Sequence, residues 1–412
     1  MTTGISSRKR LNLKGLIGPA LVASVAYIDP GNIATNLTAG SEYGYLLVWV
    51  VVLATASAAL FQFMSAKLGI VTGQSLPALL GERFKNPRAR TLFWLQAEVV
   101  AIATDVAEVL GGAIALSLFS HAPLIVCAVV VALISLVIAA LRSRGRGQFD
   151  SVVIVLMLAT TFGFSYIMLR SNVDWMGVGQ GLLPVFNGTG TLLLASSIIG
   201  ATIMPHAIYA HSALSRDTFA RGGSEVEPDW RRRLAGVRAD VAIAMGLAGL
   251  GNLAVMVFSA ANLRGDGIHA TMDGAAAILD QRVGTGIGLV FVFAMFSSGL
   301  ASSAVGNYAA DEIAQGLMKF KVRPMLRRLM ALVPALLIIA FTGNATSAIV
   351  FSQVVLSFGL PFALFPLVHI TSNRKIMGAQ VNPARVTVIG YTIAAALSVL
   401  NIALVSSLIF GA

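Results

Sequence analysis

The stretch "AYIDPGNIATN" at residues 26–36 places two oxygen-bearing side chains in an otherwise apolar run. Asp29 and Asn32 both offer hard oxygen ligands. Pro30 removes a backbone donor and Gly31 tolerates unusual dihedral angles, so the pair predicts an interrupted helix. Carbonyls freed at the end of a broken helix carry partial negative charge. The stretch is therefore a candidate cation site, and the alternative is a proline kink whose polar side chains satisfy neighbouring groups.

A second stretch, "ASSIIGATIMPHAIYAHSAL" at residues 195–214, has the same character. Gly200, Pro205 and His206 interrupt it, which predicts a second broken helix. Met204 adds a thioether beside this break. Oxygen ligands alone favour magnesium or calcium, whereas sulfur shifts preference toward transition ions, so the mixture fits manganese(II) or iron(II). The alternative for Met204 is a filler of the hydrophobic core, since the chain has 14 methionines.

Three acids follow one another in "WLQAEVVAIATDVAEVLGG" at residues 94–112. Glu98, Asp105 and Glu108 have spacings of seven and three, which place them on one face of a helix. Carboxylates in an apolar segment are costly, and a row of them suggests a proton relay. The alternative is that each acid is paired with a basic residue of a neighbouring helix.

Two further polar residues leave alternatives open. His211 could join the relay or be a core histidine with satisfied hydrogen bonds. Gln353, in "FSQVVLSFGLPFALFPL", could be an additional oxygen ligand or could form a hydrogen bond between helices.

The composition places these motifs in a membrane. With 57% hydrophobic and 11% charged residues over 412 positions, the chain is too apolar for a water-soluble protein of this length. A helix that crosses a bilayer needs roughly 20 mostly apolar residues. The sequence predicts an all-α integral membrane protein, with one domain over residues 1–412 and eleven transmembrane helices. The predicted spans are 15–37, 44–66, 92–119, 122–141, 150–169, 191–214, 239–262, 286–317, 328–342, 347–371 and 386–410.

The basic residues predict the orientation. Lysine and arginine prefer short cytoplasmic loops. With the N-terminus inside, only Arg170, Arg264 and Arg282 of the 29 lysines and arginines fall outside, so the C-terminus is placed outside. The net charge of +11 then follows from topology and does not indicate nucleic-acid binding. The lone Cys127 excludes an intramolecular disulfide.

The two predicted breaks lie five helices apart. This spacing favours an inverted repeat, with one copy over about 15–169 and the other over about 191–371. The helix at about 386–410 would be an addition. In such repeats the substrate site lies at the interface between the two copies.

The chain resembles the Nramp family of divalent metal transporters, in particular its bacterial MntH-type members. The resemblance rests on "AYIDPGNIATN", "AEVVAIATDVAEVLGGAIAL", "GATIMPHAIYAHS" and "SQVVLSFGLPFALFPL" and covers nearly the whole sequence. It implies a LeuT-like fold in the bacterial inner membrane and proton-coupled import of manganese(II), often with iron(II). It also implies that the protein needs no cofactor. The implied partners are metal ions, protons and membrane lipid, without an obligate protein partner.

The resemblance implies two sets of functional residues. The metal ligands would be the side chains of Asp29, Asn32 and Met204, the carbonyls of Ala26 and Ala201 and, in some conformations, Gln353. The proton pathway would comprise Asp29, Glu98, Asp105, Glu108, His206 and His211.

One segment departs from the family pattern. In "SSAVGNYAADEIAQGL", relatives often have Gly-Gln near Ala310 and Asp311. Asp311 and Glu312 could pair with Lys319 or Lys321, and their role is left open.

Three other functions are weighed against metal import. A sodium-coupled amino-acid symporter would share the broken helices, but it would present glycine-rich backbone to a carboxylate rather than Asp29 and Met204. A magnesium-transporting relative is disfavoured by Met204. A membrane metalloenzyme is disfavoured because no H-E-x-x-H motif occurs.

Overall fold

The computed structural model describes residues 18–144, 146–220, 230–265, 271–320, 323–342 and 344–410. The start of the first predicted span and Lys321 lie outside these ranges. Every regular element in the described ranges is helical. The helices are α1 (Pro19–Ser24), η2 (Val25–Ile28), α2 (Pro30–Tyr43), α3 (Val48–Thr72), α4 (Leu76–Arg83), α5 (Pro87–Ser120), α6 (Leu124–Arg144), α7 (Arg146–Arg170), α8 (Trp175–Gln180), α9 (Gly188–Thr202), α10 (Pro205–Ala220), α11 (Trp230–Asn262), α12 (Met272–Arg282), α13 (Ile287–Met318), α14 (Pro324–Thr342), α15 (Ala345–Thr371), α16 (Arg374–Met377), η3 (Gly378–Gln380) and α17 (Ala384–Phe410).

Nine helical segments in the described part of the chain are long and apolar enough to cross a membrane. They correspond to nine of the predicted spans, including the one at 191–214, which falls on α9 and α10 together. The predicted first span is divided into shorter helices, of which Pro19–Ile28 is apolar but short. The predicted span 328–342 falls within α14, which is not among the nine. The number eleven therefore stays a prediction.

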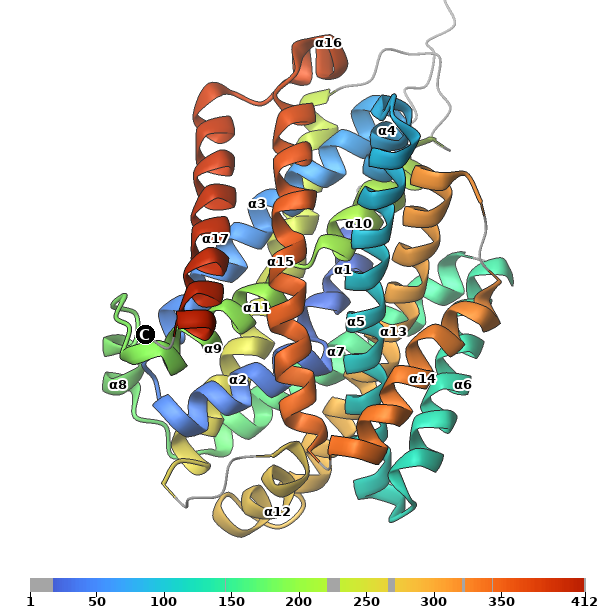
Figure 1. Ribbon diagram of the computed structural model, residues 1–412. Helices are drawn as coiled ribbons and strands as arrows, with labels where there is room; N and C mark the ends of the chain where they lie inside the picture. The colour runs from blue at the N-terminus through green and yellow to red at the C-terminus, as the bar shows by residue number, and fades with distance from the viewer. Residues whose placement is uncertain are drawn as a thin grey trace, which may run out of the picture.

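The helices form a single bundle (Figure 1). α13 packs against α5 and α7, α11 packs against α2 and α3, and α10 packs against α3. α4 and α16 lie at one end of the bundle, and α12 lies at the other. This arrangement surrounds the segments on either side of Asp29 and Met204 with other helices.

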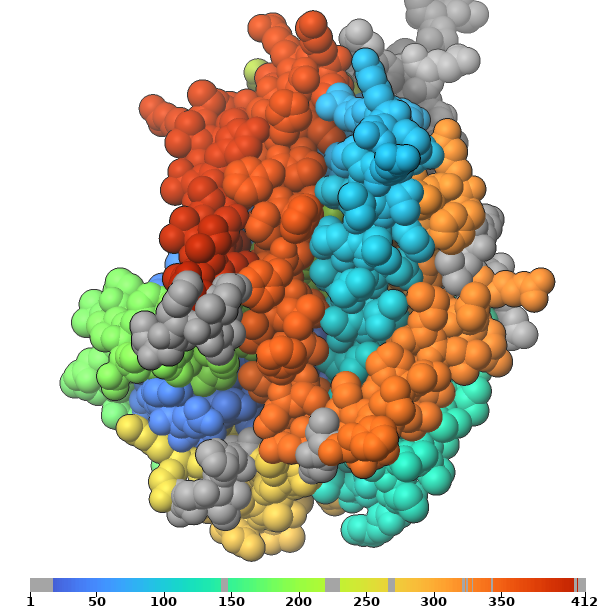
Figure 2. All heavy atoms as spheres, in the orientation of Figure 1, coloured from blue at the N-terminus to red at the C-terminus, as the bar shows by residue number. Residues whose placement is uncertain are grey.

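The outer helices carry apolar side chains toward the surroundings. Figure 2 shows one face of the molecule, on which α17, α15, α5 and α14 lie next to one another. Each of these four helices has large apolar residues that are exposed, as expected for contact with lipid. Among them are Leu92 and Val99 on α5, Leu337 on α14, Phe351 and Phe358 on α15, and Val388 on α17. Together with the nine spans, this surface defines a multi-pass membrane protein.

Candidate metal site and carboxylate row

The first break lies where the sequence predicts it. η2 ends at Ile28, Asp29 is extended with φ −86° and ψ 170°, and α2 begins at Pro30. Oδ1 of Asp29 accepts a hydrogen bond of 2.7 Å from the backbone N–H of Asn32, which caps α2. The acid therefore has a structural role at the start of the helix, and its second oxygen is left for another partner.

The second break is also confirmed. α9 ends at Thr202 and α10 begins at Pro205, so Ile203 and Met204 lie between the two helices. The backbone of Ile203 is not helical, with φ −101° and ψ 76°. Met204 is fully buried.

Asn32 joins the two breaks. Its Nδ2 donates to Oδ1 of Asp29 and to the carbonyl oxygen of Ala201, each over 2.8 Å. Its Oδ1 accepts a hydrogen bond of 3.1 Å from the hydroxyl of Thr202. The structure thus brings Asp29, Asn32 and the Ala201 carbonyl together, although they are far apart in the sequence.

The other predicted ligands surround this group less directly. Gln353 lies on α15 and packs against Gly31, where an added Cβ would be 2.2 Å from its Nε2. Ala26 is fully buried in η2, just before the first break, and Met204 lies within the second. All six predicted ligands are therefore located at the two breaks or beside them.

Two oxygens of this group are buried without a hydrogen-bond partner in the described residues. They are Oδ2 of Asp29 and Oε1 of Gln353. A buried polar atom without a partner is costly, and a cation is one way to satisfy such oxygens. The described residues contain no cluster of three or more His, Cys, Asp or Glu that could hold a metal. A metal here would be held by one carboxylate together with amide, carbonyl and thioether groups.

Side chains from other helices stabilise the first break. The carbonyl of Tyr27 accepts from Nδ2 of Asn252 over 2.6 Å, and the carbonyl of Ile28 accepts from the hydroxyl of Ser298 over 2.5 Å. These contacts satisfy backbone groups that the interrupted helix leaves without partners. Neither residue was predicted from the sequence, where the only signal was a polar side chain in an apolar span.

A glutamine connects the break to His211. Gln62 on α3 donates to the hydroxyl of Tyr27, and its Oε1 forms a hydrogen bond with Nδ1 of His211. His211 thus has the hydrogen bond expected of a satisfied core histidine. His206 differs, because both of its ring nitrogens are buried without a hydrogen-bond partner in the described part of the chain.

Glu98, at one end of the carboxylate row, is paired with a basic residue of a neighbouring helix, which is the alternative to a proton relay. Oε1 of Glu98 lies 2.8 Å from Nη1 of Arg327 on α14, and both side chains are almost fully buried. Nε of Arg327 also lies 3.5 Å from Oδ1 of Asp311. Arg327 was not predicted from the sequence, because its helix carries several basic residues and only packing shows which one turns inward.

Asp105 and Glu108 converge on a glycine of α13. An added Cβ at Gly306 would be 3.1 Å from Oδ1 of Asp105 and 3.2 Å from Oε2 of Glu108. One turn beyond Glu108, a Cβ at Gly111 would be 2.1 Å from Cβ of Pro30. The row of acids on α5 therefore runs from the first break to Arg327.

The acids of α13 have arginine partners that the sequence did not predict. Oε1 and Oε2 of Glu312 accept from the two Nη atoms of Arg216 over 3.0 and 3.3 Å. Asp311 lies against Arg327. Lysines close in sequence were one possibility, but packing brings in arginines from α10 and α14, whose forked donors match a carboxylate.

Removing the guanidinium of Arg327 should destabilise the protein. In Arg327→Met the carboxylate of Glu98 would stay buried without its 2.8 Å partner, which costs roughly 3–5 kcal/mol in comparable sites. We expect a clear fall in thermal stability in detergent. Arg323→Met, an exposed arginine of the same segment, should have little effect.

The double variant Glu98→Gln/Arg327→Met should recover part of the lost stability, because it no longer buries an unpaired charge. A single variant as stable as the wild type would show that the ion pair does not stabilise the fold.

These features define a class: a multi-pass helical membrane protein with two broken helices that meet at a candidate ion site. Residues 20–407 match the model of the Nramp family, described as natural resistance-associated macrophage protein-like. The chain belongs to this family.

Similar proteins match this chain over most of its length. A divalent metal cation transporter MntH of Mycobacterium tuberculosis is 45% identical over 392 residues, covering 95% of this chain and 91% of that protein. The protein of the same name from Bacillus subtilis is 39% identical over 392 residues, covering 94% and 91%. The crystal structure of a manganese transporter of Eremococcus coleocola has a TM-score of 0.86 and 28% identity, covering 99% of this chain and 89% of that one.

Proposed function

We propose that the protein imports divalent transition metal ions, chiefly manganese(II) and also iron(II), coupled to protons and by alternating access. One observation carries the proposal: Asn32 joins Asp29 to the carbonyl of Ala201 across two broken helices. Beside it lie buried oxygens of Asp29 and Gln353 that have no hydrogen-bond partner among the residues the structure describes. The names of the similar proteins, which are divalent metal cation or manganese transporters, support it.

The residues have distinct roles in this proposal. Asp29 supplies the charge that offsets the dehydration of a divalent ion, and the carbonyls of Ala26 and Ala201 replace part of its water. Met204 supplies the soft ligand. Asn32 turns its oxygen toward the ion, which requires the present hydrogen bonds of its amide group to rearrange. Gln353, on α15, approaches the ion or moves away from it as the site opens to one side of the membrane or the other.

The orientation of the protein in the membrane is inferred from the distribution of its basic residues. The end of the bundle with α4 and α16 faces the cytoplasm, and the end with α12 faces outside the inner membrane (Figure 1). The chain then enters the membrane from a cytoplasmic N-terminus, and its C-terminus lies outside. The inverted repeat of LeuT-like transporters gives the two broken helices equivalent positions.

The row of carboxylates supplies a proton route in this proposal. Glu108 lies one turn before Gly111, which contacts Pro30 at the first break, and Asp105 lies one turn further from it; both acids face Gly306. A metal that binds beside Asp29 brings two positive charges into the interior, and these favour release of a proton along the row. Glu98, Arg327 and the histidines of α10 complete the polar path.

The replacement Asp105→Asn separates coupling from binding. We expect metal-stimulated acidification of proteoliposomes to fall more than metal binding, because an asparagine side chain cannot carry a proton and this position lies outside the ligand set. Internal pH and bound manganese are measured on the same preparation. Normal acidification alongside normal uptake would contradict the relay and favour a structural role for the acids.

Uptake assays test the proposed function against its main rival. Purified protein in liposomes should accumulate radioactive manganese, with internal acidification in step, and should not accumulate labelled amino acids. Amino-acid uptake driven by a sodium gradient, without manganese uptake, would favour the symporter. Magnesium uptake equal to that of manganese would favour a magnesium transporter.

A further inference from the structure

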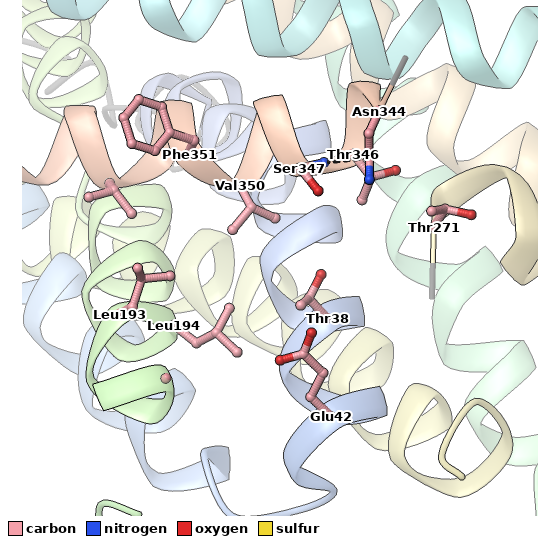
Figure 3. Close-up of a pocket in the computed structure, with 12 residues that line it drawn as sticks. Thr38, Glu42, Leu193, Leu194, Thr271, Asn344, Thr346, Ser347, Val350 and Phe351 are labelled. Atoms are coloured by element: carbon pink, nitrogen blue, oxygen red, sulfur yellow. Dashed lines mark hydrogen bonds between the residues drawn. The ribbon is translucent and has the colours of Figure 1, made fainter. Parts of the chain in front are cut away.

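A pocket opens on the side of the molecule where α2 ends and α15 begins (Figure 3). It has a volume of about 610 Å³ and lies between α2, α9 and α15, beside the start of α12. Polar and apolar side chains both line it, among them Thr38, Glu42, Leu194, Asn344, Ser347 and Val354.

Among the described residues that line this pocket, Glu42 is the one with an ionisable side chain. It lies one turn after Thr38 on α2, and both side chains point into the pocket (Figure 3). Ser347 and Asn344 face them from α15. Oδ1 of Asn344 caps α15 by accepting from the backbone of Ser347, so the start of this helix is fixed. The pocket therefore presents one carboxylate and several neutral oxygens.

The pocket leads toward the two breaks. Val354 lines it, and the neighbouring Gln353 packs against Gly31. Leu194 lines it on α9, about two turns before Ala201. At this depth α9 and α15 are in close contact, since a Cβ at Gly200 would be 2.3 Å from the carbonyl oxygen of Gln353. The apolar floor thus separates a polar mouth from the metal site beneath.

We propose that Glu42 and the oxygens facing it form an outer loading site, which holds hydrated divalent cations before they reach Asp29. The inference rests on the proposed function. An ion with six waters needs roughly 200 Å³, at about 30 Å³ for each water, so it fits the pocket without dehydration. A carboxylate in a cleft with apolar walls focuses the field and raises the local concentration of cations.

The outer loading site does not select between metals. Its ligands are hard oxygens that contact the water shell of an ion, and magnesium keeps its water shell more firmly than manganese does. Magnesium therefore occupies the outer loading site and competes with manganese there. Selection takes place deeper, at Met204, after the ion has lost water.

Neutralising Glu42 tests the outer loading site. In cells that express Glu42→Gln at the wild-type level, the KM for manganese uptake should rise at least about threefold at low ionic strength, with the maximal rate unchanged. The difference should shrink with added monovalent salt, because the Debye length falls to about 8 Å at 0.15 M. Glu42→Lys should raise the KM further.

Two matched variants make the test specific. Glu82→Gln removes an exposed carboxylate from α4, at the opposite end of the bundle, and should leave the KM unchanged. Arg264→Gln removes a positive charge whose guanidinium lies against Gly44, near Glu42, and should lower the KM. At constant ionic strength, added magnesium should raise the KM of the wild type more than that of Glu42→Gln.

The outcomes separate this inference from the proposed function. If the wild type takes up manganese and Glu42→Gln has the same KM at low ionic strength, the outer loading site is overturned and the proposed function is not. An equal rise in Glu82→Gln would also overturn it, because the effect would then come from net charge. A wild type without manganese uptake would overturn the proposed function, and the loading site with it.

Discussion

Asp29→Asn should abolish manganese transport. Asp29 is the only formal negative charge in the two breaks, and the ion must exchange water for ligands that offset its charge. The replacement is nearly isosteric, and its side-chain oxygen can still cap α2 by accepting from Asn32. The fold should therefore survive while transport is lost. The measurement is manganese influx into proteoliposomes, with thermal stability measured on the same preparation.

A matched control lies close by. Asp240 on α11 is also buried, and its carboxylate accepts from the backbone of Gly18 and Ala20 at the start of α1. Asp240→Asn removes a buried charge that touches the same broken helix but lies outside the site, and it should keep most of the transport. Near-wild-type influx in Asp29→Asn would show that the metal site is elsewhere.

Met204→Ala should change which ions compete with manganese. Calcium and magnesium use a thioether poorly, so a site that includes Met204 rejects them better than oxygen ligands alone. We expect the variant to keep appreciable manganese transport through Asp29, Asn32 and the carbonyls. Calcium and magnesium should become much stronger competitors, and cadmium, the softest ion, should lose the most affinity.

The measurement is competition by calcium, magnesium and cadmium against manganese uptake in liposomes. Met256→Ala supplies the control, because Met256 is a fully buried methionine of α11 whose carbonyl lies against Gly40 on α2. It should cost stability through the cavity it leaves, without changing the order of competition. The same order in the wild type and Met204→Ala would make Met204 a residue of the hydrophobic core.

The two breaks could be predicted because their causes are local. Proline and glycine restrict or free the backbone at their own positions, and the structure interrupts its helices beside Pro30 and Pro205. The shared face of the α5 acids was likewise predictable from helical spacing, and Asp105 and Glu108 both reach Gly306. The contact between the breaks through Asn32 agrees with the idea of one site made from two distant segments.

The partners of these residues could not be predicted. They lie on helices that are distant in sequence and reach the site residues only through packing, so no spacing rule identifies them. These partners are Asn252, Ser298, Gln62 and Arg327. The pocket around Glu42 was also missed, because its lining comes from three helices and the turn before a fourth. Hydropathy alone also does not fix how many of the shorter helices cross the membrane.

Anomalous X-ray scattering from crystals soaked in manganese tests the central claim most directly. We expect one strong anomalous peak at the manganese edge. It should mark an ion bound by Asp29, Asn32, the carbonyls of Ala26 and Ala201, and the sulfur of Met204. The peak should be absent from Asp29→Asn. A strong peak elsewhere in the bundle, or none at the breaks in crystals that contain manganese, would contradict the account.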